Sequence, residues 1–247
     1  MSVLSILKPH AVSALSSTLV DGFRLLTADP KEVGYMPNVV SQMTIDVDLG
    51  SIKPVSSIYL GAMSGALDFQ VQGGAAAYTT NLIGNVAVAP KGSGVGSRKW
   101  LASFAEQSWR YVRLTSTTNA PNLFEIGNLV VGKAFRPTWG HEYGGGRGVG
   151  DTGAVTRLQS GGFGINPGAR FKAWDFTLGD LTDAEVEELY DIALEVGVTN
   201  PIVVCENPDI TAGLDARIHY GLFAKLDRFE RLIPGATKWN LKVEEWI

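Results

Sequence analysis

The sequence is poor in the residues that bind metals or form disulfides. Cys205 is the single cysteine among 247 residues, which excludes an internal disulfide and a zinc site built on cysteines. The three histidines are His10, His141 and His219. They lie far apart in the sequence and do not show the short spacing of a histidine metal site. We therefore predict no metal and no cofactor. Cys205 ends an apolar run and is interpreted as a small buried side chain.

The chain also lacks long apolar runs and an excess of basic charge. No run of eighteen apolar residues is present, so no membrane-spanning helix is predicted. Lys8 follows the apolar residues at the start of the chain, whereas a secretory signal places its positive charge before them. The formal net charge of −4 gives no indication of a specific nucleic-acid partner. We expect a soluble protein that is made in a cytoplasm and not exported from it.

Two segments match the consensus sequences of phosphate-binding motifs but lack the structural context that those motifs need. Residues 127–133 fit G-x-x-x-x-G-K, but Ala134 stands where a magnesium-binding Ser or Thr belongs, and the middle of the pattern has the composition of a strand. Residues 148–153 fit G-x-G-x-x-G, with no strand predicted before them and no helix after them. We interpret the first as a strand and the second as a glycine-rich loop.

Paired carboxylates, which a glycosidase would need, occur at Asp46 and Asp48. Both lie on the polar side of an alternating strand, so the simpler interpretation is a charged outer face that keeps a sheet in solution. Glu187 with Glu188, and Glu244 with Glu245, show no pattern that would shift a pKa. We therefore predict no catalytic residue and no enzymatic activity.

Alternating strands separated by glycine are what the sequence does contain. In residues 43–49, apolar and polar residues alternate strictly, as in a half-buried strand. Short strands about ten residues apart, with glycine turns between them, are typical of a β-sandwich or barrel. We predict a β-sandwich over residues 1–135, closed by two strands that are joined by a turn. The predicted strands are 43–49, 55–60, 67–71, 109–114 and 123–131.

The middle of the chain, residues 136–168, is rich in glycine and has few periodic apolar positions. We interpret it as a long loop or an extended arm between two domains, because structureless loops of this length are uncommon inside a compact domain.

The last part, residues 169–247, contains one clear helix. Thr182 and Glu185 form a capping box at its start, and Gly197 is expected to end it. Strands surround this helix, which predicts an α+β sandwich or split barrel. The predicted strands are 171–178, 201–205, 218–226 and 238–243. The predicted buried stripe of the helix is Val186, Leu189, Tyr190, Ala193 and Val196.

Trp100 and Trp109 are the candidate glycan contacts. An exposed tryptophan at the rim of a sandwich can stack on the face of a sugar, although a tryptophan in a sandwich more often fills the core. Trp100 follows a polar, glycine-rich segment at 91–99 and is expected to be the more exposed of the two.

Segments in both halves resemble proteins of tailed bacteriophages and prophages. Residues 24–30, 43–49, 109–114 and 124–132 resemble a discoidin-type, galactose-binding-like jelly roll of minor tail and tail-tip proteins. The second half resembles the distal-tail or tail-tube-like domain that continues it. The segments that carry this second resemblance are 171–178, the capped helix, 201–205 and 220–226.

The resemblance implies a mainly β protein that is a structural component of a phage tail tip or baseplate. It implies a ring-forming adaptor between the tail tube and the adsorption apparatus, located in the virion after synthesis in the host bacterial cytoplasm. The implied partners are further copies in a ring, expected as a hexamer, and other tail proteins such as tube, hub and fibres. The strand at 238–247 is a candidate edge for such a ring, and residues 140–168 could order on a neighbouring subunit.

Two other functions remain open from the sequence. The protein could be a carbohydrate-binding module that contacts a glycan of the host cell envelope through its jelly roll. A glycan hydrolase is the third possibility, and it would depend on Asp46 and Asp48.

Overall fold

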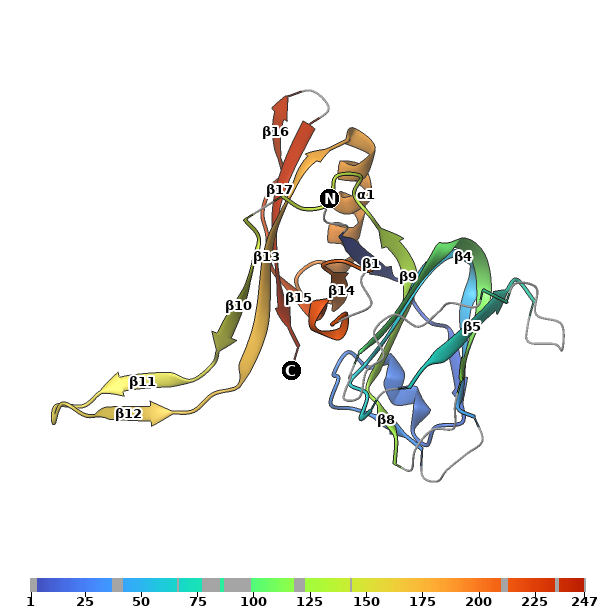
Figure 1. Ribbon diagram of the computed structural model, residues 1–247, viewed down its shortest axis with the longest axis horizontal. Helices are drawn as coiled ribbons and strands as arrows, with labels where there is room; N and C mark the ends of the chain where they lie inside the picture. Colours follow the sequence, from blue (N-terminus) through green and yellow to red (C-terminus); the bar gives the residue numbers. More distant parts are fainter. Residues whose placement is uncertain are drawn as a thin grey trace.

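The computed structural model describes residues 4–36, 42–65, 67–76, 85–86, 99–117, 123–142, 144–209, 213–233 and 236–246. Within these residues the protein consists mainly of β-strands, with one α-helix and two short 3-10 helices (Figure 1). The predicted class, mainly β, is confirmed. The helices are α1 (Asp183–Val196), η1 (Gly22–Leu26) and η2 (Asp215–Arg217).

Thirteen strands form one large antiparallel sheet that runs through both halves of the chain. Its main path follows the order β10-β13-β17-β15-β14-β1-β9-β4-β7-β5-β6, while β16 pairs with β17 and β2 pairs with β4. The strands are β1 (Ser5–Pro9), β2 (Ala14–Ser17), β4 (Thr44–Gly61), β5 (Phe69–Gly74), β6 (Asn85–Val86), β7 (Trp100–Ser116), β9 (Asn128–Phe135), β10 (Gly146–Asp151), β13 (Arg170–Leu181), β14 (Ile202–Cys205), β15 (Ile218–Leu226), β16 (Glu230–Ile233) and β17 (Ala236–Glu245).

Two further pairs of strands lie outside this sheet. β3 (Gly34–Tyr35) pairs with β8 (Glu125–Ile126), and β11 (Ala154–Arg157) pairs with β12 (Phe163–Asn166).

The strand β1 joins the two halves of the molecule. It pairs with β9 on one side and with β14 on the other, so the sheet continues from one half into the next. Its side chain Ile6, together with the preceding Leu4, belongs to the core of the second half, while Leu7 packs in a third cluster between the halves. The division of the chain at residues 135 and 168 stays a prediction, and the segment before residue 135 contributes β1 to the second core.

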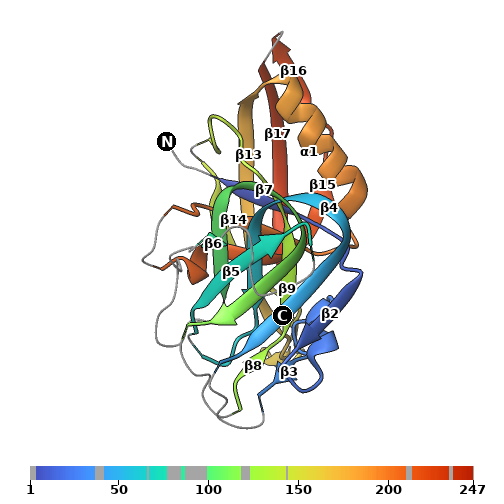
Figure 2. The ribbon, with the colours of Figure 1, turned by 90° about the vertical axis from the view of Figure 1, so that its right-hand side faces the viewer.

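The first half surrounds its own core. Ile45, Val47 and Leu49 of β4 point inward and are fully or almost fully buried, as their alternation predicted. The pairing of β4 with β7 shifts register after Asp48 and again after Val55. Such irregularities bend strands, and the sheet curves over its own core (Figure 2).

The second half has a two-layer arrangement in which α1 covers one face of the sheet (Figure 1). The predicted capping box is confirmed, because Thr182 Oγ1 accepts from the Glu185 amide at 3.3 Å and Glu185 Oε2 accepts from the Thr182 amide at 2.9 Å. Gly197 ends the helix with a φ of 58°. The predicted stripe is wrong at Tyr190, which is 43 % exposed, and the buried position belongs to Ile192. Tyr190 instead meets Phe229 edge-on, with ring centroids 6.2 Å apart.

One predicted pair of strands and one predicted edge are placed differently by the structure. The strand at 109–114 does not pair with the one at 123–131, because β4 lies between β7 and β9. The last strand, β17, is also not an edge, since it lies between β13 and β15. Local patterns show which residues form strands, whereas the neighbours of a strand depend on contacts that are distant in sequence.

The glycine-rich middle of the chain contains strands and is not a loop. β10 pairs with β13 along six residue pairs, and β11 and β12 extend the same ribbon away from the body (Figure 1). The ring of Phe171 lies where a Cβ at its cross-strand partner Gly150 would stand, so glycine at this position lets the ring cover the strand. The second phosphate-like pattern, 148–153, therefore begins in β10, which corrects its interpretation as a loop.

Candidate functional sites

Trp100 and Trp109, the two candidate glycan contacts, are buried. Trp100 is 1 % exposed and meets Phe69 edge-on, with ring centroids 5.3 Å apart. Trp109 is 4 % exposed and its ring lies directly against the backbone at Gly73, where a Cβ would collide with it. The expectation that Trp100 is exposed is wrong, because the ring fills the space inside the curved sheet. The free ring face that stacking on a sugar requires is absent at both positions.

The carboxylates Asp46 and Asp48 form ion pairs across the outer face of the first half. Arg113 binds Asp46 with two hydrogen bonds of 2.6 and 2.7 Å. Arg110 binds Asp48 in the same way, at 2.9 and 3.0 Å, and this hydrogen bonding lowers the pKa of Asp48. A carboxyl group whose pKa is lowered in this way stays charged and is a poor general acid. The predicted charged outer face is confirmed, and the arginines of β7 are partners that the pattern of β4 alone could not show.

Cys205 and the first phosphate-like pattern have the structural roles that the sequence predicted. Cys205 is buried, and burial raises the pKa of its thiol to about 12, so it is protonated at neutral pH. Most of residues 127–133 belongs to β9, whose backbone pairs with β1 and β4. Within the described parts of the chain, no group of three His, Cys, Asp or Glu residues could hold a metal ion. No helix among the described residues is long and apolar enough to cross a membrane.

A charged cluster in the second half is centred on Glu206, whose side chain is 11 % exposed. Arg147 of β10 donates to both carboxylate oxygens of Glu206, at 2.6 and 2.8 Å, and Nε2 of the fully buried His219 lies 2.8 Å from Oε1. Burial alone would raise the pKa of Glu206, but the hydrogen bonds from His219 and Arg147 outweigh it and hold the pKa at about 2. The base of the ribbon is therefore fixed to the body by a charged pair.

Glu245 extends this cluster to the first half. Its Oε1 accepts from Lys99 Nζ at 2.7 Å, and Lys99 also donates to the carbonyl of Ile218 at 2.7 Å. Burial would raise the pKa of Glu245, but hydrogen bonding to His219 and attraction to Lys99 hold it at about 2. This corrects the expectation that no pattern shifts the pKa of Glu245, and the shift depends on residues from five segments that are distant in the sequence. Neither of the two cavities described next is lined by Glu206, His219 or Glu245. The hydrogen bonds of the cluster connect β10, β15, β17 and Lys99.

The larger cavity is a groove of about 460 Å³ between the two halves. Its walls are mostly apolar. The polar residues that line it are His10, Thr27, Asn200, Tyr220 and Glu195, and the carboxylate of Glu195 is paired with Lys8 at 2.9 Å. Nε2 of His10 lies 2.7 Å from the carbonyl oxygen of Pro54. Burial lowers the pKa of His10, so the imidazole is neutral at neutral pH. A groove with apolar walls and a few polar groups is suited to an uncharged polar ligand.

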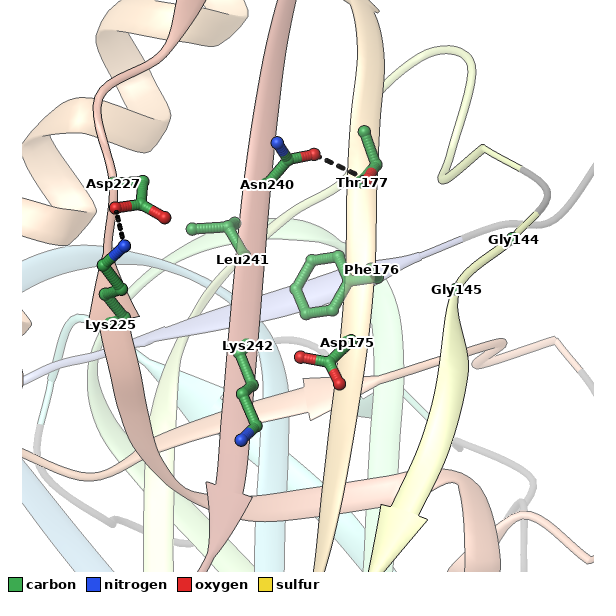
Figure 3. Close-up of a pocket in the computed structure, with 10 residues that line it drawn as sticks. All are labelled: Gly144, Gly145, Asp175, Phe176, Thr177, Lys225, Asp227, Asn240, Leu241 and Lys242. Atoms are coloured by element: carbon green, nitrogen blue, oxygen red, sulfur yellow. Dashed lines mark hydrogen bonds and ion pairs between the residues drawn. The ribbon is translucent and has the colours of Figure 1, made fainter.

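The smaller cavity, of about 300 Å³, lies over β10, β13, β17 and β15 (Figure 3). Its polar side chains bind one another: Thr177 Oγ1 donates to Asn240 Oδ1 at 2.7 Å, and Lys225 Nζ lies 2.6 Å from Asp227 Oδ1. Phe176, the aromatic residue among its lining, is 2 % exposed. This cavity offers no ring face for a sugar and few free polar groups.

The most unusual surface is the ribbon, which we call the arm and define as residues 146–172. Pairing places Val155 opposite Ile165 and Arg157 opposite Phe163, so these four side chains share one face of the hairpin. Val155, Phe163 and Ile165 are 67 %, 63 % and 72 % exposed. Val149, nearer the body, is 78 % exposed. An exposed apolar face of this kind marks a surface that binds another molecule.

No protein-family model matches the sequence, and no curated protein matches it. Half of the chain is similar to solved structures of carbohydrate-binding modules. One is the CBM32 of AlyQ in complex with 4,5-unsaturated mannuronic acid, which is 20 % identical with a TM-score of 0.38, over 50 % of this chain and 96 % of that one. Another is a selenomethionine-labelled mutant of chitosan-binding module 1 from a Paenibacillus sp. IK-5 chitosanase/glucanase, at 18 % identity and a TM-score of 0.42, over 51 % and 99 %.

A pectin-binding carbohydrate-binding module is similar at 12 % identity, with a TM-score of 0.36, over 50 % of this chain and 92 % of that one. The names of these three structures are those of carbohydrate-binding modules. At these identities and TM-scores, the likeness assigns neither a ligand nor a binding site to this chain. The tail-tip assignment stays a prediction from the sequence resemblance.

Proposed function

We propose that the protein is a self-assembling structural subunit that binds a neighbouring copy of itself through the arm. The observation that carries this proposal is the apolar face of the hairpin, formed by Val155, Phe163 and Ile165. A two-stranded hairpin is marginally stable by itself in water. An extended hairpin with three exposed apolar side chains on one face gains stability when a partner covers that face.

The finer part of the proposal concerns the assembly. The arm and the surface that receives it are different parts of the chain, and a contact between unlike surfaces closes into a ring or continues as a filament. Together with the resemblance of the sequence to tail-tip proteins, this favours a ring-forming adaptor in a phage tail tip or baseplate. The proposed role is structural, without an enzymatic step.

The molar mass in solution tests this proposal. We expect light scattering after gel filtration of the full-length chain to give a defined multiple of the subunit mass of 26.5 kDa. Ile165→Asp places a charge on the apolar face and should shift the population toward the monomer. Thr156→Asp adds the same charge to the opposite face of the same hairpin and should leave the mass unchanged. A monomer at every accessible protein concentration would overturn the proposal.

We propose glycan binding as a second function, because of the groove of about 460 Å³ between the halves. With Trp100 and Trp109 buried, a sugar would contact the apolar walls of the groove and hydrogen-bond to Asn200 and His10. Affinity electrophoresis with alginate, chitosan and pectin is the test. We expect retention by at least one polymer that is lost in Asn200→Ala and kept in Asn166→Ala, an exposed residue of the arm. If none of the polymers retards the protein, the proposal is wrong for these glycans.

A further inference from the structure

The helix α1 has a second, exposed apolar stripe beside its buried one. Tyr190 and Leu194 are four residues apart in α1 and are 43 % and 66 % exposed, and Val198, which is 48 % exposed, follows the end of the helix. The helix covering a sheet normally turns polar residues to the solvent. The core side of α1 is already occupied, so the outer stripe requires a separate explanation. Its buried side chains are Val186, Leu189, Ile192, Ala193 and Val196.

The outer side of α1 is also strongly acidic. The helix contains Asp and Glu residues but no Lys or Arg. Some of these carboxylates are paired within the chain, for example Glu188 with Lys133 at 2.6 Å. Glu187 and Asp191 lie on the same side as Tyr190 and Leu194, and no residue of the described structure forms an ion pair with either. The outer face of α1 therefore combines apolar side chains with free negative charge.

The hairpin of the arm has the complementary character. Arg157 lies on the same face as the apolar side chains of the hairpin and has no ion-pair partner within the described part of the chain. Further toward the body, Arg170 is paired with Asp151 at 3.4 Å, and Lys172 lies opposite Val149 and adds a positive charge. The apolar face of the hairpin therefore has a positive charge at Arg157, whereas the apolar stripe of α1 lies beside the negative charges of Glu187 and Asp191.

The spacing of the two apolar surfaces also agrees. Tyr190 and Leu194 are one helical step of four residues apart, about 6 Å along the axis. Ile165 and Phe163 are two residues apart in a strand, roughly 6.6 Å. Side chains of the arm can therefore alternate with those of the helix along one line.

The two surfaces cannot meet within one molecule. The arm leaves the body at β10 and β13 and extends away from it, while α1 lies against the body on another side (Figure 1). About ten residues on each side of the hairpin give it a reach of roughly 30 Å. The contact is consequently intermolecular.

We infer that the outer face of α1, formed by Glu187, Tyr190, Asp191 and Leu194, is the surface that receives the arm of a neighbouring copy. This inference rests on the proposed self-assembly and names its docking site. The arm face supplies the apolar side chains and Arg157, and α1 supplies the apolar stripe and two carboxylates. Because the two surfaces differ, each subunit donates one arm and receives another, which builds a ring or a filament.

Cysteine cross-linking tests the contact directly. A full-length chain with Ile165→Cys and Leu194→Cys, oxidised with diamide, should give a ladder of covalent oligomers on a non-reducing gel. Cys205 is buried and should not take part. Each single variant alone should give nothing beyond a dimer. A control pair, Ile165→Cys with Ile52→Cys, uses an exposed apolar residue of the first half and should give no ladder.

Substitutions on α1 separate this inference from the proposed function. We expect Leu194→Asp to raise the protein concentration needed for assembly at least about tenfold. Arg157→Glu should weaken assembly, and combining it with Asp191→Arg should restore it in part. If the wild type assembles and Ile165→Asp disrupts it, but Leu194→Asp has no effect and no ladder forms, the docking site is wrong while self-assembly stands. A wild type that stays monomeric overturns both.

Discussion

The first half of the molecule buries its large apolar side chains, whereas the arm exposes them. Trp100 and Trp109, in the first half, are 1 % and 4 % exposed, whereas Phe163 and Ile165, in the arm, are 63 % and 72 % exposed. The difference lies in the number of layers. A sheet that curves over itself has an interior, which its large side chains fill. A two-stranded hairpin has none, so its apolar face remains available to a partner. The candidate site is therefore found in the arm and not among the tryptophans.

The largest change in stability is expected when an aromatic side chain is removed from the core of the first half. Trp100→Ala should lower the free energy of unfolding by about 3 to 5 kcal/mol, because it leaves a cavity inside the curved sheet. Urea denaturation followed by circular dichroism measures this change. The matched control is Trp139→Ala, whose side chain is 54 % exposed and should cost about 0.5 kcal/mol or less. Similar costs for both variants would contradict the assignment of Trp100 to the core.

The charged cluster should be nearly as sensitive. Glu206→Gln leaves Arg147 and the buried His219 without their carboxylate, and it should cost about 3 kcal/mol. Asp46→Asn breaks an ion pair of the same bidentate geometry on the outer face and should cost about 1 kcal/mol or less. Urea denaturation of both variants at pH 7 makes the comparison. If Asp46→Asn cost more, the contacts of Glu206 would stabilise the fold less than an ion pair on the outer face does.

The same cluster predicts the response to acid. The pKa values of Glu206 and Glu245 are about 2 in the folded protein, below the ordinary value of 4.5. Their stabilising effect is therefore complete above pH 4.5 and is lost as the pH falls from 4.5 toward 2. Unfolding free energies measured at several pH values should decline across this window, with a shallower decline in Glu206→Gln. An equally steep decline in the variant would assign the acid sensitivity to other groups.

In the arm, the loss of an apolar side chain should hardly change the stability of a subunit. Phe163→Ala is expected to alter the unfolding free energy of the isolated subunit by less than about 0.5 kcal/mol, because the ring is mostly in water. Denaturation at a protein concentration low enough to keep the subunits apart is the measurement. A loss of several kcal/mol would show that the ring packs against its own chain.

The smallest effect is expected at Cys205, where burial raises the pKa of the thiol to about 12. A thiol reagent at pH 8 should leave the folded protein unmodified and should modify one thiol per chain after denaturation. Mass spectrometry distinguishes the two states. Rapid labelling of the folded protein would contradict the position of Cys205 in the sheet.

Features that depend on neighbouring residues in the sequence were predictable. The capping box of Thr182 and Glu185, the alternation along β4 and the burial of Cys205 all follow from local patterns, and the structure confirms them. The mainly β class could be predicted for the same reason.

Features that depend on distant residues were not predictable. The charged cluster draws on five separate segments, β1 leaves its own half to pair with β14, and β4 separates two strands that look like neighbours in the sequence. The strands of the arm could not be predicted for a different reason. Its glycines, such as Gly150, interrupt the alternation by which a strand is recognised, because the ring of a cross-strand neighbour covers them.

The solution mass of the full-length protein, compared with that of Ile165→Asp, tests the central claim most directly. If the apolar face of the arm binds a neighbouring copy, the wild type is a defined oligomer and the variant dissociates toward 26.5 kDa while keeping its fold. If both proteins have the same mass at every concentration, the exposed face of the arm does not mediate self-assembly.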